Sequence, residues 1–251
     1  MFARAVDTLL FSSLWVSLAA VALTAASAQA QGVPTLRVAV LAGCATWVVY
    51  VVDRLRDLER DVHTAPARSA FVTAHATSLR CAAGLAGAAA GALAVMLPWQ
   101  TLLAPAAAAP LAFFHRRLKR FELAKAAYVT AAWTAITVGM PAGLGGARHT
   151  AWAAGAIALA VFANAIASNI RDAEAGAARF GSRRVLRLAY AAAAAATALP
   201  LLGPDAVRPL AAVGAFTLCA LVGFRATERY GLGVVDGALV LGGLSAFAIA
   251  A

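Results

Sequence analysis

The chain has 251 residues, of which 63% are apolar and only 13% are charged, and its mean hydropathy is +0.80. Charged residues make up roughly 25% of an ordinary soluble domain, and a soluble fold of this length cannot bury so much apolar surface. Intrinsic disorder is also excluded, because it needs low hydrophobicity and dense charge. We therefore expect an integral membrane protein, with residues 1–251 forming a single domain and a net charge of +10.

Nine apolar stretches follow one another along the chain, most of them close to the length that crosses a bilayer as a helix. They lie at residues 8–29, 36–55, 78–97, 99–114, 124–140, 150–170, 185–202, 207–224 and 232–251. The fourth is the weakest, because it is short and contains Pro105 and Pro110. The stretches lack the alternation and the aromatic girdles of a membrane β-barrel. The predicted fold class is all-α, a polytopic bundle of nine transmembrane helices.

The first stretch allows a second interpretation. Ala26-Ser27-Ala28 follows an apolar run and resembles a signal-peptidase site. The run from Thr8 to Ala28 is long for a signal peptide, which favours a retained helix. Cleavage would leave eight spans and would not change the orientation of the others.

The basic residues are distributed unevenly between the two sets of connections. Eighteen of the 21 lie before the first stretch or after the second, fourth, sixth and eighth, and the alternate connections hold only Arg37, Arg148 and Arg208. Cytoplasmic loops are enriched in Lys and Arg, so we expect a cytoplasmic N-terminus and an outward-facing C-terminus, in the bacterial inner membrane. A wrong number of helices would scramble this asymmetry, so the pattern favours nine spans.

A group of acidic residues follows the second stretch. Asp53, Asp57 and Asp61 are spaced four residues apart, which places them on one face of a helix. Like charges at this spacing repel one another. One solution is a Mg2+ ion, which takes one or two carboxylates together with waters and phosphate oxygens. The other is a helix neutralised by its own arginines, Arg54, Arg56 and Arg60.

A second acidic group follows the sixth stretch, on the same predicted side of the membrane. It reads Asn169-Ile-Arg171-Asp172-Ala-Glu174-Ala-Gly176. The basic residues that accompany the two groups are Arg68, Lys119, Arg120 and Arg171. Cations that face two acidic groups suggest a diphosphate held by metal and by Lys and Arg together, although the positive-inside rule also explains cytoplasmic arginines.

One acid lies apart from both groups. Asp236 is about one turn inside the ninth stretch. An acid within a membrane span is a functional candidate, and a carboxylate bonded to a neighbouring helix explains it equally well.

These motifs resemble those of the UbiA superfamily of intramembrane prenyltransferases. The family's first motif, Asn-x3-Asp-x3-Asp followed by Pro-x-Arg, resembles Asp53, Asp57 and Asp61 with Pro66-Ala-Arg68. The second motif resembles the run from Arg171 to Gly176, continued by Gly181-Ser-Arg183-Arg184, and the family's Lys-Arg element resembles Lys119-Arg120. The chain departs from the family at two positions, where Asp53 replaces the usual Asn and Gly176 replaces the last Asp.

The resemblance implies a Mg2+-dependent prenyltransferase whose partners are an isoprenyl diphosphate, a lipophilic acceptor and membrane lipid, with no nucleic acid. It implies one metal ion at Asp57 and Asp61, with Asp53 as a further ligand, and another at Asp172 and Glu174. The implied diphosphate-binding residues are Arg68, Lys119, Arg120 and Arg171. The implied catalytic residues are Asp57, Asp61, Asp172 and Lys119.

Other functions fit parts of the same pattern. A membrane terpene synthase would keep the diphosphate chemistry and cyclise the cation without an acceptor. A non-catalytic, lipid-binding homologue is favoured if Gly176 ends metal binding. A transporter is disfavoured, because its charges are expected near mid-span in broken helices, whereas nearly all these acids lie at helix ends.

Overall fold

A computed structural model describes residues 2–118, 123–172 and 181–251, and within these ranges the chain forms helices and turns without a strand. The N-terminal part consists of α1 (Phe2–Phe11), α2 (Leu14–Ala30), α3 (Leu36–Arg56), α4 (Leu58–Thr64), α5 (Pro66–Ala74) and α6 (Ala76–Val95). The middle part consists of η1 (Trp99–Leu102), α7 (Leu103–Leu118), α8 (Ala124–Thr134), η2 (Ala135–Gly139), α9 (Met140–Ala142) and α10 (Thr150–Arg171). The C-terminal part consists of α12 (Ser182–Leu201), η3 (Asp205–Leu210), α13 (Ala211–Val222), α14 (Glu228–Tyr230), η4 (Gly231–Val235) and α15 (Asp236–Ala250).

Several of these helices have the length and composition to cross a membrane. In the described ranges, five candidate spans are Leu36–Arg56, Ala76–Val95, Thr150–Arg171, Asp205–Val222 and Glu228–Ala250. A sixth is the pair Ala5–Phe11 and Leu14–Ala30, which is bent by 67° between its two halves. The predicted all-helical membrane protein is thus confirmed, with five or six candidate spans. Helices also occupy the other predicted stretches, but α7, α8 and α12 are outside these candidates, so the count of nine stays a prediction.

Small residues set how closely the helices pack. A Cβ added at Gly243 of α15 would lie 2.9 Å from Ala22 of α2, and one added at Gly214 of α13 would lie 2.5 Å from the backbone of Ala196 in α12. Glycines at such contacts let helix backbones approach each other in lipid. The close-packed interior is completed by large aliphatic side chains such as Leu23 and Ile157, which are fully buried.

The helix α2 belongs to this interior. Its residues Ala26, Ser27 and Ala28 are all buried, so the sequence that resembles a signal-peptidase site lies inside the bundle. Just beyond α2, the buried Gln31 donates a hydrogen bond to the carbonyl of Val138 over 3.3 Å and accepts one from Thr150 over 3.0 Å. Cleavage after Ala28 would remove a helix that the rest of the bundle packs around.

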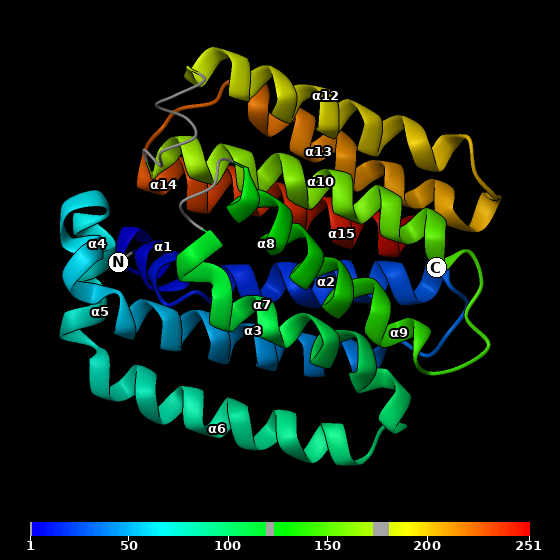
Figure 1. Ribbon diagram of the computed structural model, residues 1–251, viewed down its shortest axis with the longest axis horizontal. Helices are drawn as coiled ribbons and strands as arrows, with labels where there is room; N and C mark the ends of the chain where they lie inside the picture. Colours follow the sequence, from blue (N-terminus) through cyan, green and yellow to red (C-terminus); the bar gives the residue numbers. More distant parts are fainter. Residues whose placement is uncertain (1, 119–122, 173–180) are drawn as a thin grey trace.

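In contrast to the buried α2, helix α6 is largely exposed and lies at the lower edge of the bundle beside α3 (Figure 1). Its Leu85 and Val95 are 75% and 88% exposed, as expected for apolar side chains that face lipid. The N- and C-termini lie at opposite ends of the bundle in this view. The end that carries the N-terminus also carries α4, α5 and α14, and the first acidic group and Asp172 of the second lie at this end (Figure 1).

Candidate functional site

The first acidic motif lies where α3 gives way to α4. The amide of Asp57 donates to the carbonyl of Asp53, and the amide of Asp61 donates to the carbonyl of Asp57, each over 2.9 Å. The helix is nevertheless interrupted at Asp57, whose φ of −97° and ψ of 11° depart from helical values. Asp57 thus separates α3 from α4, although helical hydrogen bonds still connect the three aspartates, so the prediction that they share one face stays a prediction.

Asp61 is bound by two arginines. Its Oδ2 lies 2.8 Å from Nη2 of Arg68 and 3.4 Å from Nη1 of Arg54. The chain turns at Ala65, and Pro66 begins α5, which returns Arg68 toward the motif. The alternative of neutralisation by arginines is confirmed for Arg54 and Asp61, with Arg68 as the closer partner. Arg56 is exposed, and the side chain of Arg60 lies outside the described residues.

The second motif begins at Asp172, which caps α10. Its carboxylate accepts hydrogen bonds from Nε of Arg171 over 2.8 Å and from Nη2 over 3.2 Å, and Nζ of Lys125 lies 3.8 Å away. Burial alone would raise the pKa of Asp172, but the charge and hydrogen bonds of Arg171, followed by the charges of Lys125 and Arg68, lower it to about 2. Asp172 is therefore ionised at neutral pH.

Arg68 links the two motifs. Its side chain is 4% exposed, and burial, together with repulsion from Arg54, lowers its pKa to about 10, while Asp61 and then Asp172 oppose this shift. Arg68 thus interacts electrostatically with the acids of both motifs, although these are far apart in sequence. The fold brings Asp61, Arg68, Arg171 and Asp172 into one charged region.

This region contains buried nitrogen atoms that lack hydrogen-bond acceptors. Among the described residues, no partner is found for Nε and Nη1 of Arg68, Nη1 of Arg171 or Nε of Arg54. Leaving such donors unsatisfied is costly, and guanidinium groups bind phosphate oxygens well. The arrangement can therefore accept an additional anion.

The structure does not bring every predicted site residue into this charged region. Lys119, Arg120, Glu174 and Gly176 lie outside the described residues. Asp53 and Asp57 are partly buried close to Asp61 in the chain. In the part of the chain that is described, no three His, Cys, Asp or Glu side chains form a group that could hold a metal ion. Arg54 and Arg68 both contact Oδ2 of Asp61, so neither ion pair involves its Oδ1.

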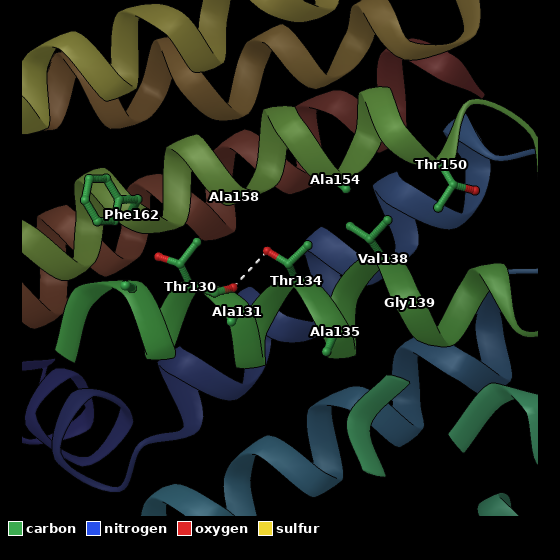
Figure 2. A pocket seen from close by; sticks show the side chains of 11 residues that line it. Thr130, Ala131, Thr134, Ala135, Val138, Gly139, Thr150, Ala154, Ala158 and Phe162 are labelled. Carbon is green, nitrogen blue, oxygen red and sulfur yellow. Dashed lines mark hydrogen bonds between the residues drawn. The ribbon is translucent and has the colours of Figure 1, made fainter. Parts of the chain in front are cut away.

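A groove of about 560 Å³ runs between α8–η2 and α10 (Figure 2). It is lined by Ala127, Thr130, Ala131, Thr134, Ala135, Val138, Gly139, Thr150, Ala154, Ala158 and Phe162. The threonine hydroxyls are used within the protein, because Thr130 and Thr134 donate to backbone carbonyls of α8 over 2.7 and 2.8 Å, and Thr150 donates to Gln31. The groove surface is consequently apolar, and it begins two residues after Lys125.

The sequence does not predict this groove or the contact of Lys125 with Asp172. The signal for the groove was the run of small residues in both helices, but small residues alone do not distinguish a groove from close packing. In the sequence, Lys125 is one of many basic residues on the predicted cytoplasmic side.

A scan against protein-family models, a search of curated proteins and a search of solved structures each return no match. The resemblance to the UbiA superfamily therefore rests on the sequence motifs.

Proposed function

We propose that the protein is an intramembrane prenyltransferase, which transfers an isoprenyl group from its diphosphate to a lipophilic acceptor. The observation that carries this proposal is the set of buried, unpartnered guanidinium nitrogens of Arg54, Arg68 and Arg171 near the start of an apolar groove. Such a pairing suits a ligand with a strongly anionic head and an apolar tail. The sequence motifs of a prenyltransferase contain two of the same arginines.

The head of the substrate would bind at the charged region. Arg68 and Arg171 would donate to phosphate oxygens through the nitrogens that have no partner in the described structure. Lys119 and Arg120 would add further positive charge, as the resemblance implies. These groups would stabilise the charge that develops on the diphosphate as it leaves.

Magnesium would be held mainly by Asp57 and Asp61, with Asp53 as a further ligand. The donor set fits this ion, because Mg2+ needs only one or two carboxylates when phosphate oxygens complete its shell, and Oδ1 of Asp61 is outside the ion pairs. Both oxygens of Asp172 contact Arg171, so metal binding by Asp172 and Glu174 would require Arg171 to turn toward the diphosphate. Bound magnesium would neutralise charge on the leaving group.

The tail would lie in the groove along α8. From Ala127 to Gly139 the groove follows about 18 Å of helix, and its volume is in the range of small-molecule sites. We further propose that α7, α8–α9 and α12 also cross the membrane, which gives the UbiA-like bundle of nine spans with a cytoplasmic N-terminus. Shorter helices can be accommodated by local thinning of the bilayer.

The proposal is tested with purified protein, Mg2+ and radiolabelled prenyl diphosphates of several chain lengths. We expect release of diphosphate, and a prenylated product when lipid extract is added. Arg68→Lys, which keeps the charge but loses the forked geometry, and Arg68→Ala should each weaken diphosphate binding by about tenfold or more.

The matched control is Arg80→Ala, because Arg80 is an exposed arginine on α6, and it should change binding by no more than about twofold. Wild-type protein that neither binds nor cleaves any prenyl diphosphate would contradict the proposal. A cyclised hydrocarbon or alcohol formed without an acceptor would identify a terpene synthase instead.

A further inference from the structure

A small cavity lies inside the bundle, between α2, α3, α8, α10 and α15. Its volume is about 30 Å³, which is enough to hold a water molecule. Apolar residues line most of it, and its polar lining residues are Tyr50, Trp133, Asn164 and Asp236. The cavity thus offers room for one small polar group in an otherwise apolar interior.

The polar residues hold one another in place. Nδ2 of Asn164 donates to Oδ1 of Asp236 over 3.0 Å and to the carbonyl of Val235 over 3.1 Å. Nε1 of Trp133 donates to the hydroxyl of Tyr50 over 3.3 Å, and the two rings meet edge to face. In the described structure, the Asn164 bond reaches only one carboxylate oxygen of Asp236 and the Tyr50 hydroxyl acts only as an acceptor. Oδ2 and the Tyr50 proton are therefore available to a ligand.

The backbone on both sides of the cavity is unusual. The described chain contains two π-helical turns, η2 and η4. The first begins two residues after Trp133, and the second ends directly before Asp236. π-Helical turns are rare and frequently occur at functional sites, because the extra residue reorients the side chains that follow. Trp133 and Asp236, which line the cavity, thus lie beside these two turns.

The cavity lies just inside the charged region. Tyr50 precedes Arg54 by one turn of α3, and Asn164 precedes Arg171 by two turns of α10. The side chain of Arg171 packs on Gly231 at the start of η4, so closely that an added Cβ would lie 2.6 Å from its Cδ, and Asp236 follows at the end of this turn. Cavity and arginines are therefore separated by about 6–10 Å along the helices.

We propose that this cavity receives the hydroxyl group of the acceptor and that Asp236, positioned by Asn164, takes its proton. This inference rests on the proposed prenyl transfer. The bond between C1 of the isoprenyl group and the diphosphate oxygen breaks, and diphosphate leaves with the electron pair. The acceptor supplies an electron pair to C1, and its hydroxyl proton passes to Oδ2 of Asp236, so the prenylated product is neutral. Asp236 is thereby a catalytic residue, and Asn164 is a positioning residue.

An acid within the membrane is costly and is a candidate for a functional role, whereas the bond from Asn164 would also suit a structural one. A purely structural Asp236 would be served as well by asparagine, which keeps the shape and accepts the same hydrogen bond from Asn164. The variant Asp236→Asn therefore separates the two roles.

The first arm of the test measures activity. Asp236→Asn should lower transfer to the acceptor by about 100-fold or more, while the melting temperature stays near that of the wild type. Asn164→Ala should lower transfer less. Asp205→Asn is the matched control, because Asp205 is an exposed acid at the far end of the bundle, and it should leave transfer unchanged. Unimpaired transfer by Asp236→Asn would overturn the inference.

The second arm measures binding and does not depend on turnover. 1-Naphthol, a small hydroxylated probe, is titrated against the intrinsic tryptophan fluorescence of the protein. We expect saturable quenching that Trp133→Phe diminishes and that Asp236→Asn weakens by about tenfold. Equal affinity in the wild type and Asp236→Asn would overturn the inference even if the wild type is an active prenyltransferase. Asp236-dependent binding in a protein that cleaves no prenyl diphosphate would retain this site and reject the proposed function.

Discussion

Arg171 makes contacts that define the charged region at the scale of single residues. It binds Asp172 through two nitrogens, packs on Gly231 and keeps Nη1 without a partner in the described structure. Its side chain is 6% exposed. A guanidinium group that is buried, fixed by a carboxylate and still has a free donor is prepared for a second anion.

Gly231 offers a way to move this arginine without changing a charge. A methyl group added there would lie 2.6 Å from Cδ and Nη1 of Arg171. Because the end of an arginine side chain yields more readily than a helix backbone, we expect Gly231→Ala to separate Arg171 from Asp172 and to weaken prenyl diphosphate binding. The cost in unfolding free energy should stay below about 3 kcal/mol, the value of a hydrogen bond to a charged group.

Binding is measured with radiolabelled prenyl diphosphate and stability by thermal unfolding in detergent. Gly91→Ala on α6 is the control, because no atom lies within 4 Å of its added Cβ. It should stabilise the helix by up to about 1 kcal/mol and leave binding unchanged. Normal diphosphate binding by Gly231→Ala would show that Arg171 does not contact the ligand from its observed position.

At the scale of elements, α8 and α10 form the groove together, and neither helix forms it alone. Ala154 and Ala158 of α10 face the row from Thr130 to Val138 across it (Figure 2). Since each threonine hydroxyl is satisfied inside the protein, the groove presents methyl groups and small side chains. This surface suits a hydrocarbon chain and offers few hydrogen-bonding groups to a polar ligand.

Filling the groove should therefore discriminate between substrates by length. We expect Ala158→Phe to reduce binding of C15 and C20 prenyl diphosphates by about tenfold or more, because the ring occupies space that the tail needs. The C5 diphosphate should bind nearly as before. Binding is measured at several chain lengths. Ala88→Phe, at an exposed position of α6, is the control. An equal loss of binding at all chain lengths in Ala158→Phe would show that the groove does not bind the tail.

At the scale of the whole molecule, the two termini lie at opposite ends of the bundle (Figure 1). The end near the N-terminus carries α4 and α5 and the charged region, whereas the turn between α12 and α13 lies at the other end. The positive-inside rule therefore predicts that the charged region faces the cytoplasm.

Cysteine labelling tests this orientation. Cys44, Cys81 and Cys219 are free and would first be replaced by serine. In intact cells, a membrane-impermeant maleimide should label Ala206→Cys in η3 and should not label Ala67→Cys in α5, because both positions are exposed but lie at opposite ends. Labelling of both in opened cells is the control. The reverse pattern would place the charged region outside.

Local sequence patterns predicted a good part of the fold. Every predicted stretch contains a helix, because apolar runs of this length satisfy their backbone only as helices in a membrane. Two breaks were not predicted, the bend near Ser13 inside the first stretch and the interruption at Asp57 just after the second. The bend near Ser13 is accompanied by a contact that is distant in sequence, because Nε1 of Trp47 donates a hydrogen bond to the carbonyl of Ser12 over 2.8 Å.

The candidate site was predicted in part. The positions of Asp61, Arg68, Arg171 and Asp172 at one end follow from the order of helices and loops. Their pairing does not, because positions in sequence give no distances between side chains on different helices. The place of Asp236 in an apolar stretch marks it as a candidate, whereas nothing in the sequence identifies its partner Asn164.

The sequence by itself determined the class of protein and the location of its charges, because hydropathy and the positions of charged residues are properties of short segments. Only the tertiary structure decided which acid binds which arginine, where the groove runs and what surrounds Asp236. The physical reason is that helices apolar on nearly every face carry little information about their rotation. That rotation is fixed when small residues such as Gly214 and Gly243 let particular faces approach.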